Sequence, residues 1–309
     1  MTYSVAQFAV VPWLATGWNT SSTPVRGAAF TLLVLLTTYN VVVVTHVFTH
    51  VPWFRNPALN ALASMVNSVN IGQSVQAYQL THVRNHHRHN NDRPGPGGVT
   101  RDTSSTYRRG RGGEHAGLLR YALGGALSSL AGRGAEILAG YRLWRVGPRE
   151  HQLLSLATRT PHRRRRELNQ IRLDRAAHCG SLGVFAAISW QWTLLCYLPA
   201  WFLALALVNV QNYYRHYGAR PGDRAADAVS HYGRLYNLLT FNDGYHQEHH
   251  LRPNAHWSEL PAVRERHRCV LDGTTRVVSP VPAMLGFLHR DRPMLHRAAI
   301  PGAPPGGEL

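Results

Sequence analysis

Two long runs without a charged side chain limit most strongly how this chain can fold. They cover residues 27–45 and 181–208, which are 19 and 28 residues long. A helix needs about 20 predominantly apolar residues to cross the hydrocarbon core of a bilayer, and two such runs are uncommon in soluble domains. The sequence therefore predicts an all-α integral membrane protein. A shorter apolar run near residues 5–18 predicts a short span or an interfacial helix, without the basic leader of a signal peptide.

The charge of the chain is strongly positive, with 33 Lys+Arg against 16 Asp+Glu and a formal net charge of +17 at pH 7. Lysine is absent, which is typical of a high-GC bacterium. Residues 84–175, between the two long runs, hold 19 arginines and 7 acidic residues. Arg-rich segments beside membrane spans stay in the cytoplasm, so we expect this segment on the cytoplasmic face of a bacterial cytoplasmic membrane. Anionic head groups or an acidic electron carrier are the partners that such a face would bind.

Other protein classes are excluded by composition. Few aromatic residues interleave with the arginines, so nucleic-acid binding is not expected. The three cysteines lie far apart without a CxxC pair, which excludes a Cys-based zinc finger or iron–sulfur site. A hydrophobic content of 44% and 8 tryptophans exclude a disordered chain. We expect one membrane domain over residues 1–300, with helices at 58–80 and 118–140, and a disordered tail at 301–309.

Histidine is the unusual residue, with 19 copies in 309 positions. Nine of them lie in three boxes of the form HxxxH, HxxxHH and HxxHH and in a fourth element after the second long run: His46, His50, His82, His86, His87, His246, His249, His250 and His216. Residues four apart share a helix face, so each box predicts a pair that grips one metal ion. In the second box this pairs His82 with His86 and turns His87 toward a second metal ion. Nine imidazoles suffice for two metal ions.

The type of metal follows from what accompanies the histidines. Imidazole suits Zn, Cu, Fe and Ni. The first box carries Val47 where a zinc protease of the HExxH type has its catalytic Glu. Soluble di-iron bundles use Glu ligands on four helices, whereas only the third box contains a carboxylate, Glu248. The pattern therefore indicates an all-histidine site at a membrane face.

The three boxes, in this order, resemble those of the membrane fatty acid desaturase/hydroxylase superfamily over residues 45–266. The resemblance implies transmembrane helical hairpins with a cytoplasmic helical cap that holds a His-ligated di-iron centre. It implies two Fe ions as cofactors and O2 as co-substrate. It also implies an acyl or lipid substrate, and electrons from a separate ferredoxin, rubredoxin or cytochrome with its reductase. Desaturation of the chain is the activity that we expect.

Two parts of the sequence differ in the reaction that they favour. Residues 212–218 (NYYRHYG) are similar to the NYxEHYG signature of alkane and xylene monooxygenases, with Arg215 in place of Glu, and favour hydroxylation. Residues 242–253 (NDGYHQEHHLRP) resemble bacterial fatty acid desaturases. Asp243, Glu248 and Asn212 are the candidates for orienting the ligand imidazoles. A non-enzymatic metal carrier would distribute its histidines along the spans, whereas these lie outside the apolar runs.

The topology of the second long run is constrained by the boxes. The histidines before and after it must reach the same membrane face. Residues 181–208 are long for one crossing and short for two. We therefore expect a hairpin here, bent near residues 196–199, where Pro199 interrupts helical hydrogen bonding.

Overall fold

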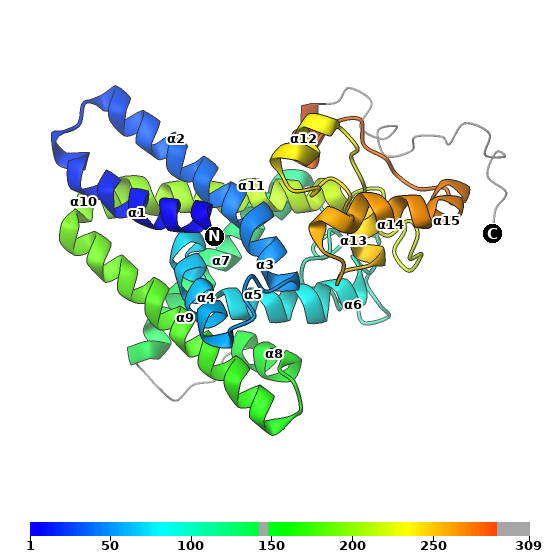
Figure 1. Ribbon diagram of the computed structural model, residues 1–309, viewed down its shortest axis with the longest axis horizontal. Coiled ribbons are helices and arrows are strands. Elements are labelled where there is room, and N and C mark those ends of the chain that lie inside the picture. Colours follow the sequence, from blue (N-terminus) through cyan, green and yellow to red (C-terminus); the bar gives the residue numbers. More distant parts are fainter. Residues whose placement is uncertain (142–147, 289–309) are drawn as a thin grey trace. The chain divides into compact units, whose positions relative to one another are not determined.

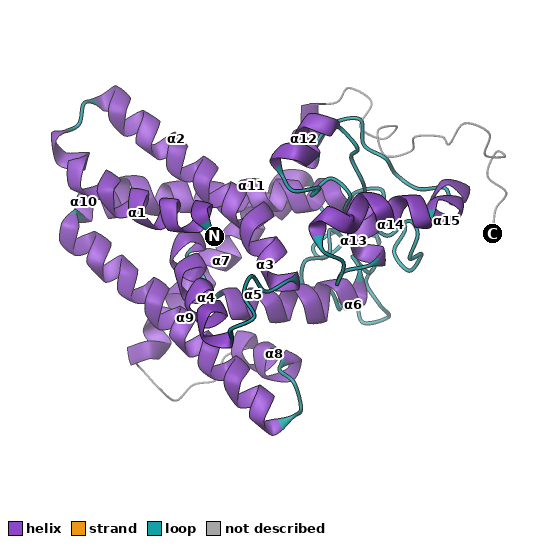
Figure 2. Cartoon of the chain, in the orientation of Figure 1, coloured by secondary structure: helices purple, strands orange, loops and turns teal. Residues whose placement is uncertain are grey.

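The computed structural model describes residues 1–141 and 148–288, and the tail predicted at 301–309 lies outside them. Figure 2 shows helices joined by loops, and no strand occurs within the described residues apart from an isolated bridge between Ser230 and Val278. The predicted all-α class is confirmed for this part of the chain.

The described residues form two compact units, each made from two separate stretches of sequence. Unit 1 comprises Met1–Arg84 and Ala122–Asn209, and unit 2 comprises Asn85–Tyr121 and Val210–Leu309. Neither unit is a consecutive piece of the chain, so the contacts that build each of them join residues far apart in sequence.

Helices dominate unit 1 (Figure 1). Its helices are α1 (Thr2–Gly17), α2 (Thr23–Tyr39), α3 (His46–His50), α4 (Pro57–Ile71), α5 (Val75–Thr81), α8 (Pro148–Leu156), α9 (Pro161–Ile188) and α10 (Trp190–Trp192), with most of α7 (Leu118–Tyr141) and α11 (Leu198–His216). Unit 2 has shorter helices and long loops. Its helices are α6 (His87–His89), α12 (Arg234–Leu239), α13 (His246–Leu251), α14 (Leu260–Arg266) and α15 (Arg268–Gly273), with the ends of α7 and α11.

Two helices are long and apolar enough to cross a membrane. They run over Thr23–His50, with 28 residues, and Trp190–His216, with 27 residues. The first joins α2 and α3 through a π-helical segment at Asn40–Thr45, and the second joins α10 and α11 through another at Thr193–Tyr197. Both long apolar runs therefore contribute to helices of membrane-spanning length, and each of these helices ends on a histidine of the predicted site.

The bend in the second run was predicted near residues 196–199. The structure places it at Ser189 instead. Ser189 has extended backbone angles (φ −157°, ψ 104°), which end α9. Its hydroxyl accepts a hydrogen bond from the Trp192 amide at 3.2 Å and so begins the next helix. Pro199 lies in the first turn of α11. The π-helical segment just before it absorbs the lost hydrogen bond without a break.

The helix predicted over residues 58–80 is interrupted at Gly72, which has φ +67°. Trp201 of α11 donates a hydrogen bond from Nε1 to the Ile71 carbonyl oxygen at 2.8 Å. A Cβ atom at Gly72 would lie 2.5 Å from this nitrogen. Both the positive φ and the close indole therefore require glycine here, and the chain leaves α4 in a new direction before α5.

Unit 1 combines an apolar core with a buried polar path. The core includes Trp192, Ala204 and Leu33. Beside it, Asn40 donates from Nδ2 to Gln7 Oε1 at 2.7 Å, and Thr45 donates to Asn40 Oδ1 at 2.6 Å. Because these polar groups are buried, their mutual hydrogen bonds avoid the cost of unsatisfied donors. The path ends one residue before His46 and so helps to fix where the first histidine box begins.

Candidate metal centre

The first box and the start of the second come together inside unit 1. The ring centroid of His46 lies 5.3 Å from that of His50 and 4.7 Å from that of His82, and His50 and His82 are 5.0 Å apart. The i, i+4 spacing of α3 places His46 and His50 on one face, as predicted. The α5 helix brings His82 to the same place.

The second box does not follow the α-helical pairing that its spacing predicts. His82–His86 is a π-helical segment, and in such a turn residues five apart replace residues four apart as neighbours. His82 consequently packs with His46 and His50 in unit 1. His86 packs in unit 2 with other histidines. The predicted pairing of His82 with His86 on one metal ion is wrong, because the π turn is underwound and holds one residue more than an α turn.

Four buried histidines converge in unit 2. One nitrogen from each of His86, His216, His246 and His250 lies within 4.8 Å of the others. Their exposed fractions are 1%, 0%, 2% and 4%. They come from the second box, the end of α11 and α13, so the loop-rich unit joins segments more than 100 residues apart. A buried group of four imidazoles with converging ring nitrogens suits the binding of a metal ion.

Two pairs of ring nitrogens face each other directly. His246 Nε2 lies 3.3 Å from His216 Nε2, and His249 Nε2 lies 3.0 Å from His87 Nε2. Nitrogens that bind one cation at about 2.1 Å and at right angles are about 3 Å apart. The donor set therefore fits a transition-metal ion, and in all three boxes the histidines point their nitrogens toward other histidines.

A carboxylate that the sequence analysis missed orients His86. Asp102 is fully buried, and its Oδ2 lies 2.8 Å from His86 Nδ1. The amides of Asn91 and Ser104 donate to the same carboxylate at 2.9 and 2.8 Å. Burial opposes the charge of Asp102, but His86 and these amides outweigh it and lower its pKa. An ionised Asp102 only accepts hydrogen bonds, so His86 donates from Nδ1 and presents Nε2 to a metal ion.

Two more rings of the four-histidine group have a partner in unit 2 for their Nδ1 atom. His216 Nδ1 lies 3.2 Å from the Asp227 carbonyl oxygen, and His250 Nδ1 lies 3.2 Å from Asn90 Oδ1. Asn90 has φ +44°, a conformation that asparagine tolerates better than most residues. These partners fix which nitrogen of each ring is directed inward. No spacing rule links them to the boxes, which is why the sequence did not reveal them.

The two α13 histidines of this group are held neutral. Burial, followed by the nearby positive charge of Arg215, lowers the pKa of His246 well below its ordinary value. Burial, followed by His87, lowers the pKa of His250 in the same way. Neutral imidazole is the form that binds metal ions, so the environment keeps these rings ready to bind.

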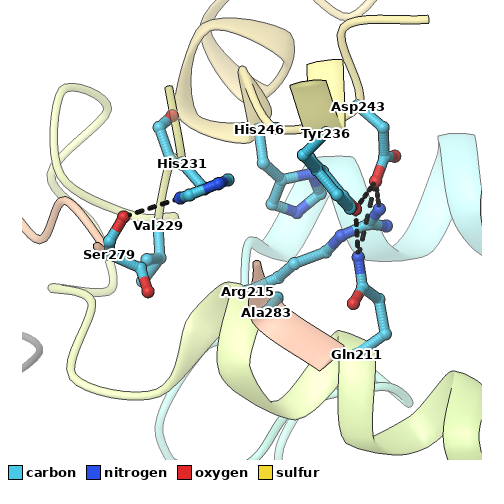
Figure 3. A pocket seen from close by; sticks show the side chains of 11 residues that line it. Gln211, Arg215, Val229, His231, Tyr236, Asp243, His246, Ser279 and Ala283 are labelled. Atoms are coloured by element: carbon cyan, nitrogen blue, oxygen red, sulfur yellow. Dashed lines mark hydrogen bonds and ion pairs between the residues drawn. The ribbon is translucent and has the colours of Figure 1, made fainter. Parts of the chain in front are cut away.

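Asp243, one of the predicted orienting residues, lies in a polar cluster beside His246 (Figure 3). It forms a buried ion pair with Arg215 and accepts a hydrogen bond from the Tyr236 hydroxyl at 2.8 Å. Gln211 donates to Tyr236 at 2.9 Å. The cluster lines a cavity of about 10 Å³, room for one water molecule. Arg215, the departure from the monooxygenase signature, thus has a carboxylate partner of its own.

The other two predicted orienting residues fasten the site to its surroundings. Glu248 accepts hydrogen bonds from Ser230 at 2.7 Å and from Tyr232 at 2.6 Å, and so anchors α13. Asn212 donates to the Tyr121 hydroxyl at 2.6 Å and to the Ser104 carbonyl oxygen at 3.3 Å. A direct role of these residues in orienting the ligands stays a prediction.

Comparison with known proteins agrees with this geometry. A family model described as fatty acid desaturase matches residues 22–279. The sphingolipid delta(4)-desaturase DES1 of Mus musculus is 41% identical over 75 residues, which are 24% of this chain and 22% of the relative. The sphingolipid delta(4)-desaturase of Candida albicans is 38% identical over 66 residues, 21% of this chain and 18% of the relative. The matched segments thus span about a fifth of the length of these relatives.

Proposed function

Because the chain belongs to the fatty acid desaturase family, we propose that it is a membrane-bound, oxygen-dependent di-iron enzyme that introduces a double bond into a lipid chain. The buried four-histidine group of unit 2 is the observation that carries the proposal. The nine predicted histidines together hold two irons, and the four nitrogens of this group serve one of them. The sphingolipid desaturases among its relatives favour a saturated acyl or long-chain-base substrate.

The chemistry of the donor set supports iron. Bound iron supplies the activation of O2 that removes hydrogen from an unactivated carbon. Neutral imidazoles leave the positive charge of the metal uncompensated and suit Fe as well as Zn. For zinc hydrolysis we would expect a carboxylate base within the boxes. Glu248, the carboxylate of the third box, instead accepts hydrogen bonds from Ser230 and Tyr232.

The chain itself orients the histidine rings and keeps bulk water away from them. Asp102 keeps the Nδ1 proton on His86, and Asn90 and the Asp227 carbonyl oxygen set the orientation of His250 and His216. The four histidines of the unit 2 group are almost completely buried, so bulk water is excluded from their ring nitrogens. Hydrogen bonds that fix the ligand histidines also fix the position of the metal ion relative to the reacting chain. This matters because small displacements of that chain lower the rate strongly.

The membrane context follows from the two apolar helices and the family. We place the histidine boxes on the cytoplasmic face of a bacterial membrane. Cys269 is exposed in unit 2, whereas Cys196 is buried. A membrane-impermeant maleimide should label Cys269 in inside-out vesicles and spare it in right-side-out vesicles, with Cys196 silent in both. The reverse pattern for Cys269 would place the site outside.

Hydroxylation is the second candidate, favoured by the likeness of residues 212–218 to the monooxygenase signature. Arg215 departs from that signature, and its ion pair with Asp243 lies beside His246. Analysis of the product separates the candidates, because desaturation yields an alkene and hydroxylation an alcohol. An alcohol as the sole product would replace the proposed reaction.

The deciding experiment measures the metal. Protein purified in detergent from cells grown on iron-57 should contain about two irons per chain, with a Mössbauer spectrum of spin-coupled ferric ions after oxidation. His86→Ala should lose iron, whereas His162→Ala, at an exposed position of α9, should keep it. One zinc per chain, or iron that is insensitive to His86→Ala, would overturn the proposal.

A further inference from the structure

A large open groove lies in unit 2 beside α13, the helix that carries His246, His249 and His250. It has a volume of about 720 Å³ and is lined in part by Arg224, Arg252, Arg266 and His267. Its lining also includes Leu251, the last residue of α13. The groove is therefore basic, and it is separate from the small polar cavity beside His246.

The arginines of this groove differ from their neighbours in how they are paired. Arg264 and Arg276 bind the Asp272 carboxylate at 2.9 and 3.4 Å, and Arg268 pairs with Glu265 and Asp272. Arg224, Arg252 and Arg266 form no ion pair with any carboxylate in residues 1–141 or 148–288. Their charges are exposed to solvent and available to an anionic partner.

The position of the groove connects it to the histidines. Leu251 follows His250 directly, and Arg252 is the next residue. Val263 of α14 also lines the groove and is buried. A partner seated in the groove would thus contact Leu251, the residue next to the predicted ligand His250. It would not have to displace a predicted ligand.

The proposed reaction, on which this inference rests, needs electrons that this chain does not provide. Conversion of –CH2–CH2– to –CH=CH– releases two hydrogens, whereas reduction of O2 to two waters takes four electrons and four protons. Two further electrons and two protons must therefore enter for each double bond formed. The donor is oxidised by two electrons in total, one at a time if it is a one-electron carrier.

We propose that the basic groove at α13 and α14 is the docking surface for the acidic face of a one-electron carrier protein. Exposed charges at the rim of an interface steer a partner and bind it reversibly, which suits a carrier that must leave after each electron. A tight site for a small phosphate would instead bury its guanidinium groups in convergent hydrogen bonds. The three groove arginines are exposed.

The test uses the full chain in detergent and an acidic [2Fe–2S] ferredoxin as the probe. The double variant Arg224→Glu/Arg266→Glu should raise the Kd at least about 10-fold, and wild-type binding should weaken as salt is raised from low to physiological concentration. Arg234→Glu is the matched control, since Arg234 is exposed in unit 2 and lies outside the groove. It should change the Kd by less than about 2-fold.

Two further measurements keep the outcomes separate. Alkene formation in a single turnover driven by dithionite needs no carrier, so its absence would count against the proposed function alone. Equal Kd values for wild type and the double variant would overturn the docking surface alone. Binding of phosphatidylglycerol vesicles that is lost in the double variant, with no ferredoxin binding, would assign the groove to a lipid surface and also overturn it.

Discussion

Asp174 in unit 1 and Asp102 in unit 2 are both fully buried carboxylates, yet their pKa values shift in opposite directions. Asp174 accepts hydrogen bonds from Ser64, Ser74, Gln170 and the amide of Gln76. Burial outweighs these neutral donors and raises its pKa. For Asp102, burial is outweighed by His86 and two amides, and the pKa falls.

The opposite pKa shifts indicate different roles for the two carboxylates. Asp174 joins α4, α5 and α9 through neutral donors, so it holds helices together. Asp102 faces an imidazole of the predicted metal site, so its charge serves the ligand. Unit 1 therefore uses a buried acid to stabilise packing, and unit 2 uses one to orient a histidine. Substitutions at the two positions should separate stability from metal binding.

Asp174→Leu should have the largest effect on stability. It leaves two buried hydroxyl donors and two partly buried nitrogen donors without this acceptor. At about 1 kcal/mol each for the buried donors and less for the others, we expect a loss of about 3 kcal/mol in the free energy of unfolding. Asp174→Asn keeps one acceptor and should lose about 1 kcal/mol. Urea unfolding in detergent micelles measures both. A Leu variant as stable as wild type would contradict the role given to Asp174.

Asp102→Asn should weaken metal binding by 10-fold to 100-fold, because an amide no longer holds the proton on His86 Nδ1 as an ionised carboxylate does. Competition against a chelator of known affinity measures the change. Asp92→Asn is the matched control, since Asp92 lies in the same loop and accepts from the amides of Arg101 and Asp102. If both variants bind metal equally well, the role of Asp102 is to hold the loop together and not to orient His86.

The pH dependence of stability should follow Asp174. A native pKa above the ordinary value of 3.8 means that the folded state favours the protonated acid. Its contribution is complete below about pH 3.8 and is lost as pH rises through the raised native pKa. The difference in unfolding temperature between wild type and Asp174→Asn should therefore shift in favour of Asn as pH increases from 4 to 7. A difference that is constant over this range would contradict the raised pKa.

The smallest effect is expected at the start of α4. The exposed Asn56 accepts a hydrogen bond from the Ala58 amide at 2.8 Å and caps the helix. Asn56→Ala should lower the free energy of unfolding by about 1 kcal/mol, and Asn56→Ser should restore most of it. Metal content should not change in either variant. Loss of metal in the Ala variant would show that unit 1 stability and the site are not separable.

Much of the fold and of the candidate site could be predicted from patterns with a fixed period. The apolar runs led to the helices Thr23–His50 and Trp190–His216, and the i, i+4 spacing led to His46 with His50 and to His246 with His250. The bend at Ser189 escaped because neither proline nor glycine marks it. Asp102 escaped because a loop, with Asn90 and Asn91 at positive φ, brings it to His86.

The π-helical segment at His82–His86 has a consequence at the level of the gene. A π turn holds one residue more than an α turn. Deleting the single codon for Val83 would restore an α-helical register while leaving every histidine codon intact. Because a π turn and an α turn each complete one revolution, such a reading-frame-preserving deletion should leave the rings on either side in the same directions and keep His86 on Asp102. One triplet of coding sequence therefore separates a π turn from an α turn without changing which histidines meet.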